Sequence, residues 1–141
     1  MKRKALSIIL LSIGAVIGGM IFNFQEFLMG SPANAKNLIV TFLYIASWVL
    51  VLVIGTRMKS RRVLTYGSIF WVITLFLAVV TIYVNVTGAS ADWALPFAIL
   101  LLGQWYGINF FAGSFLAASI IIAVISLAFS ATAIILRRSL K

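Results

Sequence analysis

Long apolar runs without a charged residue alternate with short polar segments along this chain. Three runs of this kind occupy residues 5–24, 38–56 and 63–84. Each is close to the ~20 residues that a helix needs to span a hydrocarbon layer of ~30 Å at ~1.5 Å per residue. The pattern therefore predicts one transmembrane helix over each of these ranges.

The stretch from Trp93 to Leu136 holds 44 residues without a charge. As a single helix it would be about 66 Å long, which is too long for one simple span. We predict a break at 103–107, where two glycines bracket polar and aromatic residues that favour the level of the lipid headgroups. The break leaves a half-helix over about 94–103, which is too short to cross, and a last span over about 110–136.

These elements predict an all-α fold. We expect a polytopic integral membrane protein, a four-transmembrane-helix bundle with an additional short interfacial or re-entrant half-helix before the last span. Residues 1–141 are expected to form a single transmembrane domain. The lipid bilayer is therefore the first expected partner of this chain.

Basic residues mark the ends of the predicted spans. Ten of the 11 Lys and Arg residues fall within 2–4, 57–62 and 137–141, and Lys36 is the exception. Because Lys and Arg are retained on the cytoplasmic side during insertion, four crossings place both termini in the cytoplasm. The short loops favour a cell membrane, the prokaryotic plasma membrane. A signal peptide cleaved near 33–35 is the less favoured alternative, because the first apolar run exceeds the roughly 7–15 residues usual for a signal.

Composition restricts the chemistry that the chain can perform. Hydrophobic residues make up 64% of it and charged residues 9%, against about 25% charged in soluble domains. The formal charge of +9 does not indicate a nucleic-acid partner, because the cations flank apolar segments. With no His or Cys, and with Glu26 and Asp92 as carboxylates, the sequence predicts no enzyme, no cofactor and no metal site. The predicted spans contain no Asp, Glu, Lys or Arg, which argues against an ion-coupled transporter.

Small residues line one face of three predicted spans. Gly14 and Gly18 form a G-x-x-x-G pair, which lets a neighbouring helix approach closely. The last span carries a ribbon of small residues that predicts helix packing: Ser119, Ala123, Ser126 and Ser130. A similar stripe in the third span, from Thr74 to Asn85, is expected to face it. We expect all three faces to pack inside the bundle, with a partner contact at the glycines and a serine-lined pore as alternatives.

Trp48 and Trp71 each lie nine residues from the basic loop 57–62, so both should sit about 13 Å from it along their helices. Tryptophans at this depth differ from those of an interfacial belt, and a buried indole N–H needs an acceptor. We expect the two side chains to hold the second and third spans together. Exposure to lipid is the alternative.

The predicted outer face gathers the remaining polar and aromatic residues. The candidates for binding a ligand or partner there are Glu26, Asp92, Trp93, Gln104, Trp105, Tyr106 and Asn109. Amides, carboxylates and aromatic rings beside a half-helix suit a lipid headgroup, a peptide or the extracellular segment of a partner. The alternative interpretation is an aromatic belt with solvated loop residues.

The sequence leaves three functions open. The leading expectation is a small non-enzymatic multi-pass membrane protein, an accessory, regulatory or immunity-type subunit that acts by helix packing and outer-face binding. Its expected protein partner is another membrane protein or a second copy of the chain. The alternatives are a holin-like or small channel or transport oligomer, and a lipid-handling membrane enzyme in which Glu26 and Asp92 act as acid and base.

Overall fold

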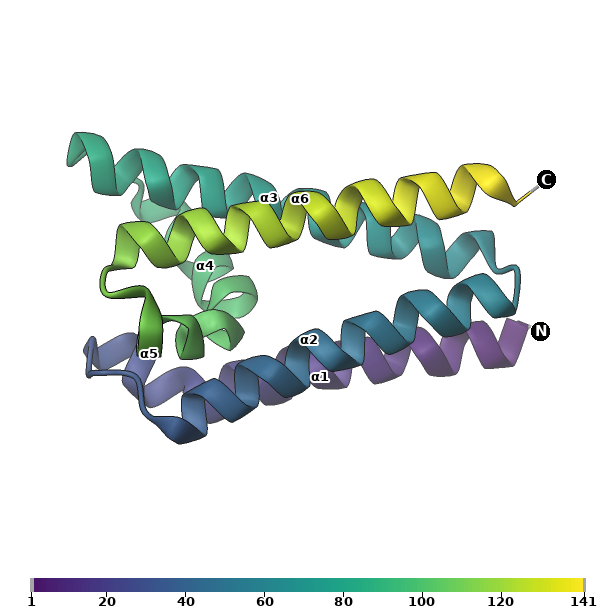
Figure 1. Cartoon of the computed structure of the whole chain (residues 1–141), viewed down its shortest axis with the longest axis horizontal. Coiled ribbons are helices and arrows are strands. Elements are labelled where there is room, and N and C mark those ends of the chain that lie inside the picture. The colour runs from purple at the N-terminus through teal and green to yellow at the C-terminus, as the bar shows by residue number, and fades with distance from the viewer. Residues whose placement is uncertain (1, 141) are drawn as a thin grey trace.

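The computed structural model describes residues 2–140, and every element of regular structure within them is a helix (Figure 1). The long helices are α1 (Lys2–Met29), α2 (Ala35–Arg57), α3 (Arg61–Thr87) and α6 (Phe115–Ser139). Between α3 and α6 the chain forms η1 (Asp92–Ala94), α4 (Leu95–Leu102), η2 (Gly103–Ile108) and α5 (Asn109–Ala112). If Asp92–Ala112 is taken as one stretch, five helical stretches among the described residues are long and apolar enough to cross a membrane.

The predicted ranges of the first three long helices lie inside α1, α2 and α3, and the predicted half-helix, 94–103, closely matches α4. The start predicted for the last helix, near residue 110, is wrong. Gly113 adopts a φ of +79°, which ends α5, and the Ser114 hydroxyl then accepts the N–H of Ala117 to begin a new helix. The last long helix therefore begins at Phe115.

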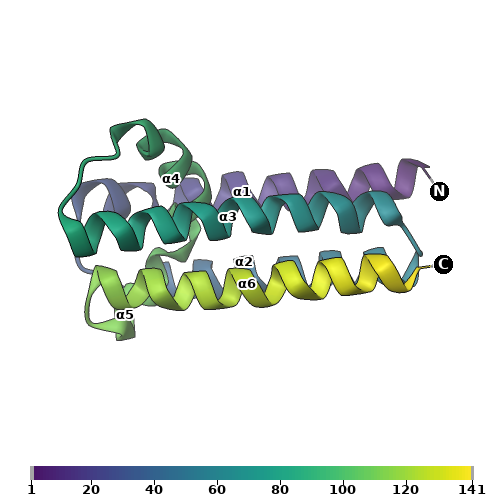
Figure 2. The same ribbon diagram turned by 90° about the horizontal axis from the view of Figure 1, so that it is seen from above.

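The long helices are arranged as two pairs. α1 packs along α2 and α3 packs along α6, while α4 and η2 lie between the pairs at one end of the molecule (Figures 1 and 2). The turn between α2 and α3 lies at the opposite end, together with the two ends of the chain (Figure 1). The three basic clusters thus gather at that end. We call it the basic end and the other the α4 end.

Aromatic rings from α2, α3, η2 and α6 form the centre of the core. Trp48 and Trp71 have no exposed surface, and their ring centroids are 5.3 Å apart. Trp71 also stacks on Phe129 of α6 at 4.3 Å and lies 5.8 Å from Trp105 of η2. The prediction that Trp48 and Trp71 join α2 to α3 is confirmed. The acceptors expected for their indole N–H groups are absent among the described residues.

The small-residue face of α6 packs against α3. The predicted ribbon is buried or half-buried throughout: Ser119, Ala123, Ser126 and Ser130. α3 contributes the buried residues Thr74 and Ala78, and α3 and α6 form the most extensive helix contact of the molecule. Ser130 Oγ donates to the carbonyl of Ser126 at 2.7 Å, so this hydroxyl is satisfied within its own helix.

The glycines of α1 do not pack as expected. A Cβ built on Gly14 or Gly18 meets nothing within 4 Å, so neither glycine is in close contact with another helix of the chain. A Cβ on Gly19 would lie 2.6 Å from Cγ of Gln104. The reason is the rotation of α1, whose inward face carries Ser12, Val16, Gly19 and Asn23.

Candidate functional site

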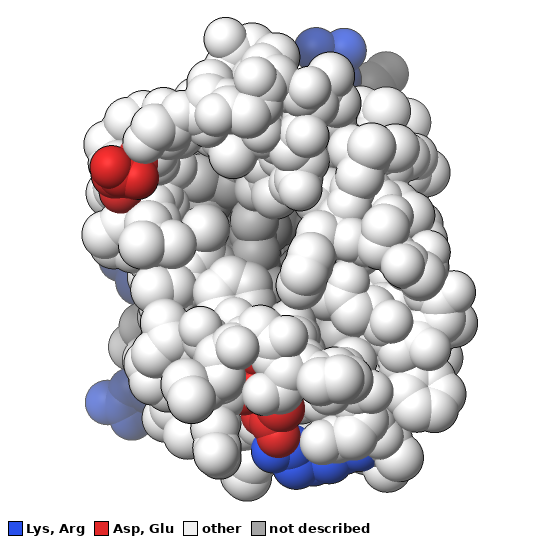
Figure 3. Space-filling view, turned by 90° about the vertical axis from the view of Figure 1, so that its left-hand side faces the viewer, with Lys and Arg blue, Asp and Glu red and all other residues white. Residues whose placement is uncertain are grey.

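A cavity of about 570 Å³ opens at the α4 end, between α3, α4 and α6. Figure 3 looks onto this end and shows it hollowed, with two acidic side chains that lie apart, one of them beside a basic side chain. Most of the wall is apolar, and its polar side chains other than the aromatic ones are Thr81, Asn85, Ser90, Asp92, Asn109 and Ser119. A cavity of this size with few polar groups is typical of a small-molecule site.

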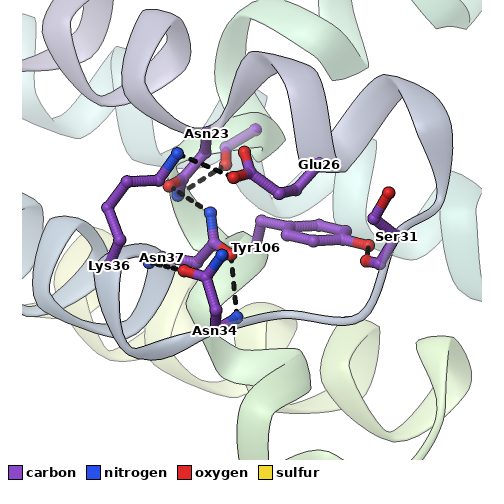
Figure 4. Close-up of polar contacts among 8 residues, drawn as sticks. Asn23, Glu26, Ser31, Asn34, Lys36, Asn37 and Tyr106 are labelled. Carbon is purple, nitrogen blue, oxygen red and sulfur yellow. Dashed lines mark hydrogen bonds and ion pairs between the residues drawn. The ribbon is translucent and has the colours of Figure 1, made fainter.

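A buried polar network holds η2 beside this cavity. Asn23 of α1, Asn37 of α2 and Gln104 of η2 have no exposed surface. Asn37 Nδ2 donates to Asn23 Oδ1 at 3.0 Å, a contact drawn in Figure 4. Asn23 Nδ2 donates in turn to the carbonyls of Gly103 and Gln104, at 3.2 and 3.3 Å. The two asparagines thus connect α2 through α1 to the backbone of η2.

Thr41 and the Gln104 side chain complete the network. The buried Thr41 Oγ1 donates to the carbonyl of Gln104 at 2.7 Å and accepts the N–H of Gly107 at 3.0 Å. Gln104 Nε2 donates to the carbonyl of Val16 at 2.7 Å. Because the α-helical pattern is interrupted at η2, backbone groups there need other partners, and leaving them unpaired in an apolar interior would cost several kcal/mol. Side chains of α2 and α1 supply these partners.

Gly107 allows η2 to approach α2 closely. A Cβ at this position would lie 2.3 Å from the carbonyl oxygen of Asn37 and 2.5 Å from Thr41 Oγ1. No side chain fits in that space, so glycine is required here by contact. Gly19 has the same role on α1, where the Gln104 side chain crosses it.

Tyr106 ties η2 to the connection between α1 and α2. Its hydroxyl donates to the carbonyl of Ser31, as Figure 4 shows. Its ring meets that of Phe27 edge to face, with centroids 5.9 Å apart. The cavity wall, which contains both rings, is thereby fixed to the end of α1.

Glu26 is paired beside the network and lies outside the cavity wall. Lys36 Nζ donates to Glu26 Oε1 at 2.7 Å, and Figure 4 shows the two side chains facing each other. This hydrogen bond is the main cause that lowers the pKa of Glu26 from 4.5 to about 2. Glu26 is therefore ionised at neutral pH, with a cation already beside it.

The structure corrects the expected position of three candidate residues. We expected Gln104, Trp105 and Tyr106 to be accessible on the outer face, but they are only 0%, 0% and 3% exposed. The network holds the amide nitrogen of Gln104, and the aromatic core takes up the Trp105 ring. Trp105 and Tyr106 instead border the cavity as buried side chains.

The other candidate residues divide into two groups. Asp92 and Asn109 join Trp105 and Tyr106 in the wall of the cavity, and Asp92 is exposed where the cavity opens. Trp93 is 61% exposed and lies outside the wall, with its ring centroid 6.3 Å from that of Phe76 on α3. The structure therefore brings four of the predicted residues together.

Sequence reasoning missed Asn37 and Thr41, which carry much of the network. Their spacing of four residues places both on one face of α2, near the start of an otherwise apolar helix. Polar side chains within an apolar helix usually face the protein interior, where they find partners. That spacing was the available signal.

Within residues 2–140, no group of three or more His, Cys, Asp or Glu side chains is placed to hold a metal ion. Comparison of the chain with protein-family models, with curated proteins and with solved structures found no match.

Proposed function

We propose that the chain is a multi-pass protein of the prokaryotic cell membrane in which α1, α2, α3 and α6 cross the bilayer with both termini in the cytoplasm. Large apolar side chains exposed along these helices support the proposal, among them Leu10, Phe42, Phe76 and Leu127. The ends of the chain and the α2–α3 turn, which carry the basic clusters, lie at one end of the molecule (Figure 1), and the acidic side chains lie at the other, where Lys36 is paired with one of them (Figure 3). This asymmetry matches the enrichment of Lys and Arg on the cytoplasmic side of membrane proteins.

In this arrangement residues 92–112 enter the membrane from the outer side and return to it. Asp92, which precedes α4, and Asn109, which follows η2, line the same cavity. Figures 1 and 2 show α4 and α5 at the same end of the long helices. The network supports re-entry because irregular backbone at membrane depth is tolerated only where the protein itself provides hydrogen-bond partners for its N–H and carbonyl groups.

Within the membrane the protein acts by binding, as an accessory or regulatory subunit of another membrane protein, with immunity to a membrane-active agent as one form of this role. The observation that carries this proposal is the open face at Gly14 and Gly18, where added Cβ atoms would meet nothing within 4 Å. Gly18 also lines a groove of about 170 Å³ between α1 and α2. A small-residue face that is left open by its own chain allows the helix of a partner to approach closely.

Co-purification from native membranes in mild detergent tests this proposal. We expect the wild-type chain to recover a stoichiometric partner, either a different membrane protein or a second copy. The double variant Gly14→Leu, Gly18→Leu should lose that partner, because two leucine side chains would fill the open face. Ala131→Leu is the matched control, since Ala131 is exposed on α6. A partner-free monomer at native expression would contradict the proposal, and so would full recovery of the partner by the double variant.

A further inference from the structure

We propose that the cavity at the α4 end binds an amphiphilic organic cation and that the Asp92 carboxylate is its charge partner. The cavity is walled by α3, α4 and α6, whereas the open glycine face is on α1. The inference therefore goes beyond the proposed subunit function and does not depend on it. A volume of about 570 Å³ lies within the range of sites for small organic ligands, ~300–1,000 Å³.

The polar part of the wall is rich in hydrogen-bond acceptors. Thr81 Oγ1 donates to the carbonyl of Leu77 at 2.9 Å, and Ser119 Oγ donates to the carbonyl of Phe115 at 2.8 Å. Because each hydroxyl carries one hydrogen, these two groups can offer a ligand only lone pairs. A ligand with N–H donors is the chemical complement of such a wall.

The Asn85 amide extends the same surface. Its Nδ2 donates to the carbonyl of Thr81 at 2.8 Å, which leaves Oδ1 as an acceptor. Ser90 and Asn109, the remaining neutral polar side chains of the wall apart from the aromatic ones, can accept as well as donate. The wall therefore offers several acceptors in addition to the Asp92 carboxylate.

The charge of the cavity is negative. Among the residues that the structure describes, its wall contains Asp92 and no Lys or Arg. Among residues 2–140 the one ion pair joins Lys36 to Glu26, so Asp92 has no cationic partner while the other acid of the chain is paired. In a chain of net charge +9, a cavity whose single charged group is an unpaired carboxylate selects a cation.

The exposed apolar part of the wall accounts for the apolar part of the ligand. Leu95 and Phe115 of the wall are each 55% exposed, and Val84 and Ile99 of the wall are half-buried. An aromatic ring such as that of Phe115 attracts cations and also packs against apolar groups. A ligand with an ammonium head at Asp92 and an apolar body against these residues matches both the charged and the apolar parts of the cavity.

Binding of phenylbutylammonium to the full-length protein in nanodiscs of zwitterionic lipid, measured by calorimetry, tests the inference. Phenylbutanol and phenylbutanoate have similar apolar bodies with a neutral and an anionic head, and empty nanodiscs measure partitioning into lipid. We expect the ammonium to bind at least about tenfold more tightly than the alcohol, and the carboxylate to bind most weakly. Equal affinity for the three probes, or no binding above that of empty nanodiscs, would overturn the proposal.

Two variants and one control locate the site. Asp92→Asn should abolish the preference for the ammonium, whereas Glu26→Gln, which changes the acid outside the cavity, should retain it. Ala98→Phe places a ring in the wall and should weaken binding of all three probes. A preference that survives Asp92→Asn, or binding that survives Ala98→Phe in a folded protein, would show that the ligand sits elsewhere and would overturn the assignment.

Discussion

Gly107→Ala is the most direct test of the contact between η2 and α2. The new Cβ would lie 2.3 Å from the carbonyl oxygen of Asn37, and real Cβ atoms essentially never come within 3.0 Å of another heavy atom. Because the nearest atom belongs to the backbone of a long helix, η2 has to move away from α2. That movement lengthens the bond from the Gly107 N–H to Thr41 Oγ1, which is 3.0 Å in the native structure.

The cost follows from the groups left without partners. Each hydrogen bond lost at Thr41 lowers the free energy of unfolding by about 1 kcal/mol, and each backbone group left buried and unpaired lowers it by about 1–3 kcal/mol more. Against this, replacing glycine by alanine restricts the unfolded chain and stabilises by about 0.4–1 kcal/mol. We expect Gly107→Ala to lower the free energy of unfolding by about 3 kcal/mol.

Gly103→Ala is the matched control in the same short helix. A Cβ on Gly103 would lie 3.9 Å from Cγ of Met20, an ordinary contact, so only the small stabilising effect on the unfolded chain remains. Titration of sodium dodecyl sulfate into a mild detergent measures the change in the free energy of unfolding for both variants. Tryptophan fluorescence is the readout, since Trp48, Trp71 and Trp105 have no exposed surface. Equal unfolding midpoints for the two variants would refute the assigned contact.

Two further predictions concern α1 and its end. Gly19→Ala should destabilise the protein by about 1–3 kcal/mol, because its Cβ would lie 2.6 Å from Gln104 Cγ. Gly18→Ala should leave the stability unchanged or raise it by up to about 1 kcal/mol. The same detergent titration measures both variants, and unfolding midpoints that move in the same direction would contradict the assigned rotation of α1. The chain has a single glutamate, so carboxyl-labelled glutamate gives one NMR signal for Glu26, which should titrate near pH 2 in the wild type and closer to its ordinary 4.5 in Lys36→Gln. Because the pKa of Glu26 is lower in the folded protein than in the unfolded chain, the stabilisation by this pair should be complete above about pH 4.5 and fade as the pH falls towards 2. An NMR titration midpoint of Glu26 that Lys36→Gln leaves unchanged would exclude the pair.

The long helices could be predicted because an apolar run of sufficient length has few other ways to satisfy its backbone in an apolar medium. The start of the last helix depended on local signals instead. Gly113 and Ser114 are common residues for ending one helix and capping the next, and they lie inside an uncharged stretch. A prediction from hydropathy alone continued the helix from α5 into α6, because hydropathy carries no information about a positive φ.

The packing of η2 could not be predicted from sequence. Gln104 lies 81 residues from Asn23 and 63 from Thr41, and a polar residue near a helix end is equally suited to headgroups and to an interior network. The rotation of α1 was predicted wrongly, although the sequence contains a signal for it. Ser12 and Asn23 share a face with Gly19 and not with Gly18, so the polar positions already distinguished the inward glycine from the open ones.

The 3₁₀ geometry of η2 explains how one short segment is attached to three parts of the protein. A 3₁₀ helix has about three residues per turn, so consecutive side chains point in three directions about 120° apart. Gln104 reaches the carbonyl of Val16 on α1, Trp105 packs on Trp71 of α3, and Tyr106 reaches the carbonyl of Ser31. An α-helical turn at the same place would direct its side chains about 100° apart and would misplace at least one of them. Trp105 and Tyr106 are buried at the border of the cavity, so a ligand bound there lies next to the segment that fixes the α1–α2 connection, and α1 carries the open glycine face. The two proposed binding surfaces are therefore joined through η2.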